Sequence, residues 1–163
     1  MMNISFEPLT EQHRIAVIDI FNYYIENSFS AYPEKVVDYS FYQKILENTK
    51  GYPAYAIKVN EEIAGFCYLS AYNPHSSFNE TALITYFISK EYTGKGIGET
   101  ALKKLEEGAK AKGIKIILAH IASLNEKSIA FHNRNGFKEC GRFAKIIKKR
   151  NTCFDIVWMQ KEI

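Results

Sequence analysis

Apolar and polar residues recur along the chain with two different periods, which predicts a mixture of helices and strands. Apolar residues recur at helical spacing up to Asn27, in a helix that Thr10 is expected to cap. A second, shorter helix is predicted from Tyr39 to Asn48. Runs rich in β-branched and aromatic residues predict strands at residues 4–9, 54–60, 62–72, 80–89, 115–121, 137–147 and 152–162. The second and third of these strands are expected to meet in a tight turn at Asn60–Glu61.

The most regular helical pattern follows a glycine-rich stretch, YTGKGIGE, at residues 92–99. One face of the predicted helix is apolar, whereas lysines and glutamates fill the other; the apolar residues are Ile97, Ala101, Leu102, Leu105 and Ala109. Gly113 is expected to end this helix, and Gly136 to end a shorter one that starts near Asn125. Helices interspersed among strands predict a mixed α/β fold, with a central sheet and helices on both faces.

The composition favours a globular domain and argues against nucleic-acid, membrane and zinc binding. The chain has 163 residues, of which 47% are hydrophobic, and this suits a single domain over residues 1–163. A net charge of +3 without a basic stripe argues against a nucleic-acid partner. No apolar run approaches the roughly 20 residues that span a bilayer, and no signal peptide is recognisable, so no membrane partner is expected. Three cysteines without a CxxC pair argue against a zinc site, and we expect buried thiols in the cytoplasm.

The glycines of the loop raise the question of an anion site. Their GxGxG spacing matches neither the ATP-binding P-loop, GxxxxGK[ST], nor the dinucleotide fingerprint, GxGxxG. Gly96 and Gly98 nevertheless permit a close backbone approach at a helix N-terminus, where free N–H groups and the helix dipole favour negative charge. From the loop alone, a phosphate site and a flexible turn that binds nothing both stay open.

The later segments carry a family resemblance. Together, TGKGIG, KIILAHI, NEKSIAFHNRNGF and DIVWMQKEI resemble the GNAT acetyltransferase superfamily, and within it the phosphinothricin N-acetyltransferase-like branch. The resemblance is strong from Ile88 to Ile163 and weaker before. It implies a mixed, largely antiparallel central sheet flanked by helices. It also implies acetyl transfer from acetyl-CoA to the primary amine of a small amine or amino-acid-like acceptor, by direct attack in a ternary complex. The same analogy favours a homodimer.

The resemblance also implies how coenzyme A is held. The pyrophosphate would bind N–H groups of the glycine loop, and the pantetheine arm would run beside the preceding strand. The implied cofactor residues are Phe87, Ile88, Gly94, Lys95, Gly96, Ile97, Gly98, Asn125 and Ser128. Thr93 stands where the family has Gln or Arg, which predicts weaker binding. Helix capping is an alternative role for Asn125, and solvation for Lys95.

Acetyl transfer to an ammonium group needs a proton acceptor, because an alkyl ammonium has a pKa of roughly 10. The branch's base, a Glu on the strand before the loop, aligns with Leu83, which cannot take a proton. Glu80 is a candidate base three residues earlier, or else an exposed strand-end charge. His132 matches the branch's His and suits acid–base work near neutrality, although a lone His is often structural. No metal is expected.

Other segments leave alternatives open. The arginines with which this branch holds a carboxylate are missing from the loop at residues 73–79. Transfer to a protein or peptide amine stays as an alternative. Leu83 and Thr93 also keep open a CoA-binding module without turnover. The basic run KIIKKR, residues 145–150, is interpreted as a solvated hairpin tip or a contact for an acidic partner. Asp155 and Trp158 are expected to pack.

Overall fold

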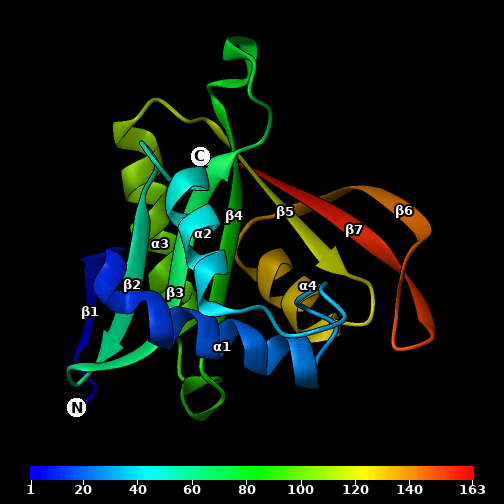
Figure 1. The fold of residues 1–163 in the computed structure, drawn as a ribbon. Coiled ribbons are helices and arrows are strands. Elements are labelled where there is room, and N and C mark those ends of the chain that lie inside the picture. Colours follow the sequence, from blue (N-terminus) through cyan, green and yellow to red (C-terminus); the bar gives the residue numbers. More distant parts are fainter.

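A computed structural model describes all residues, 1–163, and contains one seven-stranded sheet (Figure 1). The strands are β1 (Ile4–Pro8), β2 (Ala54–Val59), β3 (Glu62–Ala71), β4 (Thr81–Ile88), β5 (Ile116–Ala122), β6 (Lys138–Lys149) and β7 (Thr152–Glu162). Their order in the sheet is β1-β2-β3-β4-β5-β7-β6. Every neighbouring pair is antiparallel except β4 and β5, which are parallel. The expected mixed, largely antiparallel sheet is confirmed.

Helices cover both faces of this sheet. They are α1 (Arg14–Asn27), α2 (Tyr42–Asn48), α3 (Ile97–Ala111) and α4 (Glu126–Arg134), with short 3-10 turns η1 (Glu11–His13), η2 (Tyr39–Phe41), η3 (Ser76–Phe78) and η4 (Lys90–Tyr92). In Figure 1, α1 and α2 lie in front of the strands and α3 lies behind them. The largest buried cluster contains the inner face of α3, and a second cluster joins α1 and α2 to the other face.

The sequence pattern explains how the central elements form. The apolar stripe of α3 is almost wholly buried: Ile97, Ala101, Leu102, Leu105 and Ala109. Gly113 follows the helix at a φ of +78°, a conformation that costs glycine little, and this fits its predicted role as the end of α3. The predicted turn between β2 and β3 is also confirmed. Asn60 and Glu61 have φ of 48° and 70°, and two such residues match the twist of a tight hairpin.

The parallel strands β4 and β5 stay together for only three residue pairs. These are Thr81–Ile116, Ala82–Ile117 and Leu83–Leu118. Beyond Leu83, β4 continues to Ile88 with β3 as its one partner strand. Figure 1 shows β5 diverging from β4 towards β7. Backbone groups on the open side of β4 therefore have no strand partner, and the glycine loop follows the open end of this strand.

The tip of the β6–β7 hairpin holds the end of α1. Lys149 is fully buried, and its Nζ donates to the carbonyls of Ile25 (2.7 Å), Ser28 (2.9 Å) and Ala31 (2.6 Å). Arg150 lies over the Phe29 ring, 4.6 Å from its centre. The expectation of a solvated tip or a contact for an acidic partner is therefore wrong for Lys149, which binds the chain's own backbone.

The cysteines differ from the expectation of three buried thiols. Cys67 is buried in β3, but Cys140 and Cys153 are exposed, and all three are free. The expectation is wrong for these two because they lie on the hairpin of β6 and β7, where many side chains face solvent.

None of the helices combines the length and the apolar character that crossing a bilayer requires. No group of three or more His, Cys, Asp or Glu side chains is arranged to hold a metal ion.

Candidate functional site

The loop before α3 leaves open space above its backbone. Gly94 and Gly96 have φ of +74° and +80°, and no atom lies within 4 Å of where a Cβ would stand on either residue. The first backbone bond of the helix runs from the Thr100 N–H to the Gly96 carbonyl, at 3.2 Å. The N–H groups of Ile97, Gly98 and the next residue therefore have no helical partner. These donors and the positive end of the helix dipole make the loop a suitable anion site.

Side chains around the loop play smaller roles. Lys95 is exposed, with its Nζ 5.4 Å from the centre of the Tyr92 ring. The Thr93 hydroxyl donates to the Lys90 carbonyl at 2.8 Å, so it stabilises the turn. A Cβ on Gly98 would be in ordinary van der Waals contact with the Phe131 ring at 3.5 Å, so a side chain larger than that of alanine would press on α4.

The open end of β4 presents backbone on one side and an aromatic cluster on the other. The Phe87 ring packs against Phe21 and Phe66 beneath α1. The carbonyl of Ile88 accepts a hydrogen bond from the Tyr24 hydroxyl. The splayed segment thus has a fixed position, and contact with a ligand would fall to its remaining main-chain groups.

Helix α4 begins with the side chain that the sequence singled out. Asn125 caps it, because its Oδ1 accepts the Ser128 N–H at 3.3 Å. The Asn125 Nδ2 makes no hydrogen bond within the protein. The capping role is therefore observed, and the two N–H donors of Nδ2 are left for a ligand.

His132 lies on the inner face of α4, with 3% of its surface exposed. Its Nδ1 donates to the Ser128 carbonyl at 2.6 Å, which leaves Nε2 to accept a hydrogen bond from the Tyr86 hydroxyl. Burial lowers the pKa of His132, opposed by the bond to Ser128, and burial raises the pKa of Tyr86. Both groups are therefore neutral near pH 7, and the imidazole orients the Tyr86 hydroxyl on the splayed part of β4.

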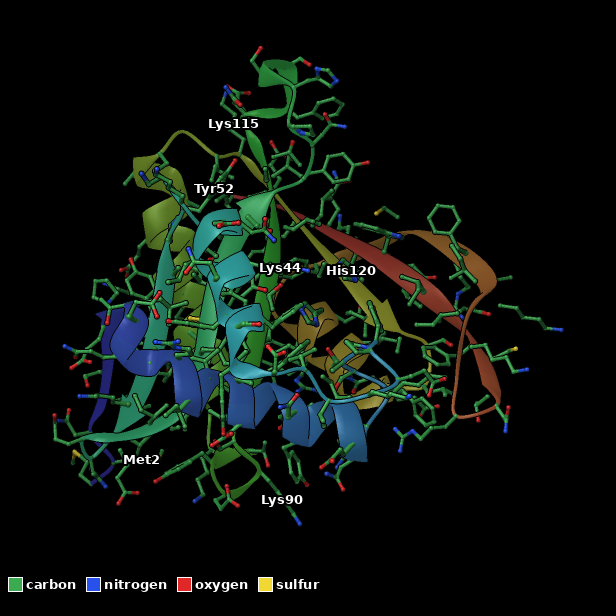
Figure 2. The ribbon with its side chains drawn as sticks, viewed as in Figure 1. Met2, Lys44, Tyr52, Lys90, Lys115 and His120 are labelled. Atoms are coloured by element: carbon green, nitrogen blue, oxygen red, sulfur yellow. The ribbon has the colours of Figure 1, made fainter.

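Glu80 lies at the other end of β4. Its carboxylate is 2.8 Å from the Lys115 Nζ, and its side chain is 62% exposed. Figure 2 shows Lys115 and Lys90 at opposite ends of the sheet, and the glycine loop follows Lys90. The structure does not bring Glu80 and His132 into contact, so their catalytic roles stay predictions.

A cavity of about 270 Å³ opens beside the far end of β5. It is lined by Tyr32, His120, Phe143, Ile146, Ile156 and Trp158. His120, labelled in Figure 2, faces Trp158 across the β5–β7 pair, and their ring centres are 5.1 Å apart. Its Nδ1 lies 3.0 Å from the Tyr32 hydroxyl. Burial lowers the pKa of His120, so this apolar cavity contains one neutral imidazole.

Sequence reasoning missed His120 and assigned Trp158 to packing alone. The available signal was a single histidine within the otherwise apolar run KIILAHI. The cavity depends on the register that pairs His120 with Trp158 and on the loop that carries Tyr32, and neither can be read from local periodicity.

Comparison with known proteins places this geometry in a family. Residues 17–137 match the model of the acetyltransferase (GNAT) family. An L-methionine sulfoximine/L-methionine sulfone acetyltransferase of Pseudomonas aeruginosa is 28% identical over 147 residues, covering 88% of this chain and 86% of that protein. A phosphinothricin N-acetyltransferase of Streptomyces viridochromogenes is 25% identical, covering 98% and 87%.

Solved structures share the fold. A ribosomal-protein-alanine N-acetyltransferase of Brucella melitensis superposes with a TM-score of 0.91 at 27% identity, covering 98% of this chain and 99% of that one. A phosphinothricin acetyltransferase of Sinorhizobium meliloti, solved in complex with acetyl-CoA, gives 0.90 at 22% identity, covering 98% and 88%. The chain therefore belongs to the GNAT family of acetyltransferases.

Proposed function

We propose that the chain, as one domain over residues 1–163, transfers an acetyl group from acetyl-CoA to the primary amine of a small molecule. The observation that carries this proposal is the pair of splayed strands β4 and β5, with a glycine loop and a free helix N-terminus at the open end. An extended arm with an anionic group fits this arrangement, because main-chain groups line its path and N–H donors stand at its end.

Named relatives support a small acceptor. The Pseudomonas aeruginosa and Streptomyces viridochromogenes proteins act on methionine sulfoximine and phosphinothricin, which are amino-acid-like molecules. The cavity beside β5 is about 270 Å³ and open to solvent, just below the usual range of roughly 300–1,000 Å³ for small-molecule sites.

The chain's residues have distinct roles in this proposal. N–H groups from Gly94 to Gly98, with Lys95 beside them, hold the pyrophosphate. The main chain at Phe87 and Ile88, the Asn125 amide and Ser128 position the pantetheine arm. Acetyl-CoA supplies the activated acetyl group as a thioester. The amine attacks the thioester directly in a ternary complex, and no acetylated enzyme is formed.

A peptide acceptor is the second candidate, because the Brucella melitensis neighbour is named as a ribosomal-protein-alanine N-acetyltransferase. An assay of thiol release from acetyl-CoA, with mass spectrometry of the product, separates the candidates. Amines, amino acids and a peptide with N-terminal alanine are offered in parallel. The proposal predicts amine-dependent release with a small acceptor. Release with the peptide alone would favour the second candidate, and binding of acetyl-CoA without release would favour a module without turnover.

We also propose that the protein is a homodimer. Phe143 and Ile146 on the edge strand β6 are 55% and 58% exposed, and apolar side chains on an edge strand are typical of association. Sedimentation equilibrium should give twice the 18.7 kDa mass of the chain. A monomer at micromolar concentration would exclude the dimer.

A further inference from the structure

The register of β4 and β5 places His120 near the point where these strands separate. Leu83 pairs with Leu118 in the last parallel pair. Side chains alternate between the faces of a sheet, so Leu118 and His120 lie on one face, as does Leu83. Tyr86 and His132 lie on the other face, with α3 and α4. His120 is therefore the imidazole on the same face as Leu83.

The surroundings of His120 fix the state of its ring. The Tyr32 hydroxyl is 3.0 Å from His120 Nδ1 and 3.4 Å from the His120 carbonyl. One assignment satisfies both contacts: Nδ1–H donates to the Tyr32 oxygen, and the Tyr32 hydroxyl donates to the carbonyl. Burial raises the pKa of Tyr32 to about 12, so this hydroxyl keeps its proton. Nε2, which makes no hydrogen bond within the protein, then carries the free lone pair.

The walls of the cavity indicate what the acceptor lacks. Apart from His120 and the Tyr32 hydroxyl, the lining consists of Phe143, Ile146, Ile156 and Trp158, none of which is charged. Arg142, next to Phe143 on β6, is already paired with Glu139 and Asp155. Within one chain, the lining therefore contains no cation for a carboxylate, and burial is the one cause that lowers the pKa of His120.

We propose that this cavity binds a primary amine with an apolar, carboxylate-free substituent, and that His120 Nε2 accepts the proton of its ammonium group. Tyr32 is the positioning residue, because it holds the imidazole with Nε2 available. This inference rests on the proposed acetyl transfer. It places a proton acceptor on the strand next to Leu83, whose side chain cannot take a proton.

The step balances without another reactant. R–NH₃⁺ gives one proton to His120 Nε2, and the neutral nitrogen then attacks the thioester carbon. The new C–N bond forms as the C–S bond breaks, and the sulfur leaves with the bonding electron pair. The nitrogen loses its second proton to the sulfur, which gives the amide and the free thiol. His120 returns its proton to solvent.

The test compares acceptors that differ in one property. 2-Phenylethylamine and phenylalanine differ by a carboxylate, and 2,2-difluoro-2-phenylethylamine keeps the shape but has a lowered ammonium pKa. Thiol release from acetyl-CoA is followed from pH 6 to 9 for the wild type, His120→Gln and Tyr32→Phe. His75→Gln, in the exposed loop before β4, is the control, and Glu80→Gln tests the competing carboxylate base. Calorimetry with acetyl-CoA and a thermal melt verify each variant.

We expect 2-phenylethylamine to be preferred over phenylalanine. His120→Gln should lower its kcat/KM about 100-fold, the usual effect of losing a general base, with a much smaller loss for the fluorinated amine. Tyr32→Phe should move the pH profile, and His75→Gln should match the wild type. A preference for phenylalanine would overturn the acceptor class. The role of His120 would be overturned by a folded His120→Gln variant with wild-type rates, or by a loss of kcat/KM in Glu80→Gln alone. Acetyl transfer as the proposed function would stand in both cases. No release with any amine would overturn the proposed function and this inference together.

Discussion

Lys149→Met tests whether the buried ammonium group holds the end of α1 and the loop to Tyr32. Methionine has a similar length but donates no hydrogen bond, so the carbonyls of Ile25 and Ala31 lose the partners at 2.7 and 2.6 Å. Both residues are buried, at 1% and 2% exposed. A buried carbonyl left without a partner costs about 1–3 kcal/mol, so the two together cost about 2–6 kcal/mol. Removing a buried charge offsets part of this sum.

The measurement is thermal unfolding followed by circular dichroism. For a domain of this size, 1 kcal/mol shifts the melting temperature by about 2–4 °C, so we expect Lys149→Met to melt about 5–15 °C lower. Lys148→Met, one residue away and exposed, is the matched control and should shift it by about 2 °C or less. The reasoning would be refuted if both variants melted together. A Lys149→Met variant that stays folded should also lose kcat/KM, because the loop carries Tyr32.

Three further predictions follow from contacts around the site. Tyr86→Phe leaves the buried Nε2 of His132 without a donor and should lower the free energy of unfolding by about 1–3 kcal/mol. Tyr92→Phe removes an exposed hydrogen bond to Glu62 and should change this free energy by about 0.5 kcal/mol or less. Equal urea midpoints for the two variants would contradict this prediction. Burial lowers the pKa of His120 and His132 in the folded protein, whereas both histidines have a pKa near 6.5 in the unfolded chain. Below about pH 6.5 the unfolded chain therefore binds more protons, and the free energy of unfolding should fall by up to about 1.4 kcal/mol per pH unit for each histidine. Urea melts at pH 7, 6 and 5 test this, and an unchanged slope in His132→Gln would count against it. Gly98→Leu should weaken the packing of α3 on α4, because a Cβ there already meets Phe131 at 3.5 Å; a melting temperature equal to that of the wild type would exclude this.

The local pattern of apolar and polar residues was enough to predict the elements whose residues lie close together in the sequence. The stripe from Ile97 to Ala109, the turn at Asn60–Glu61 and the glycine loop are each fixed by residues close in sequence, and the structure confirms the helix and the turn. The mixed sheet was predictable because strand runs and helical runs alternate along the chain. The family resemblance then implied the sheet type, which the observed strand order bears out.

The cavity beside β5 could not be predicted from the local sequence pattern. Its lining comes from Tyr32, His120 and Trp158, which are separated by dozens of residues and meet only through the β5–β7 register. A slip of one residue would turn His120 to the other face, and nothing in a short apolar strand fixes that register. The loop to Tyr32 is held by Lys149, whose basic sequence neighbours favoured an exposed position.

The central claim is that the glycine loop at the head of α3 binds acetyl-CoA, and titration calorimetry tests it most directly. Gly96→Asp places a negative charge among the free N–H groups. Gly113→Asp is the matched control, because Gly113 has a similar φ of +78° and equally open surroundings at the other end of the helix. We predict saturable micromolar binding by the wild type and by Gly113→Asp, and none by a folded Gly96→Asp variant. No binding by the folded wild type, or equal binding by the two variants, would contradict the account.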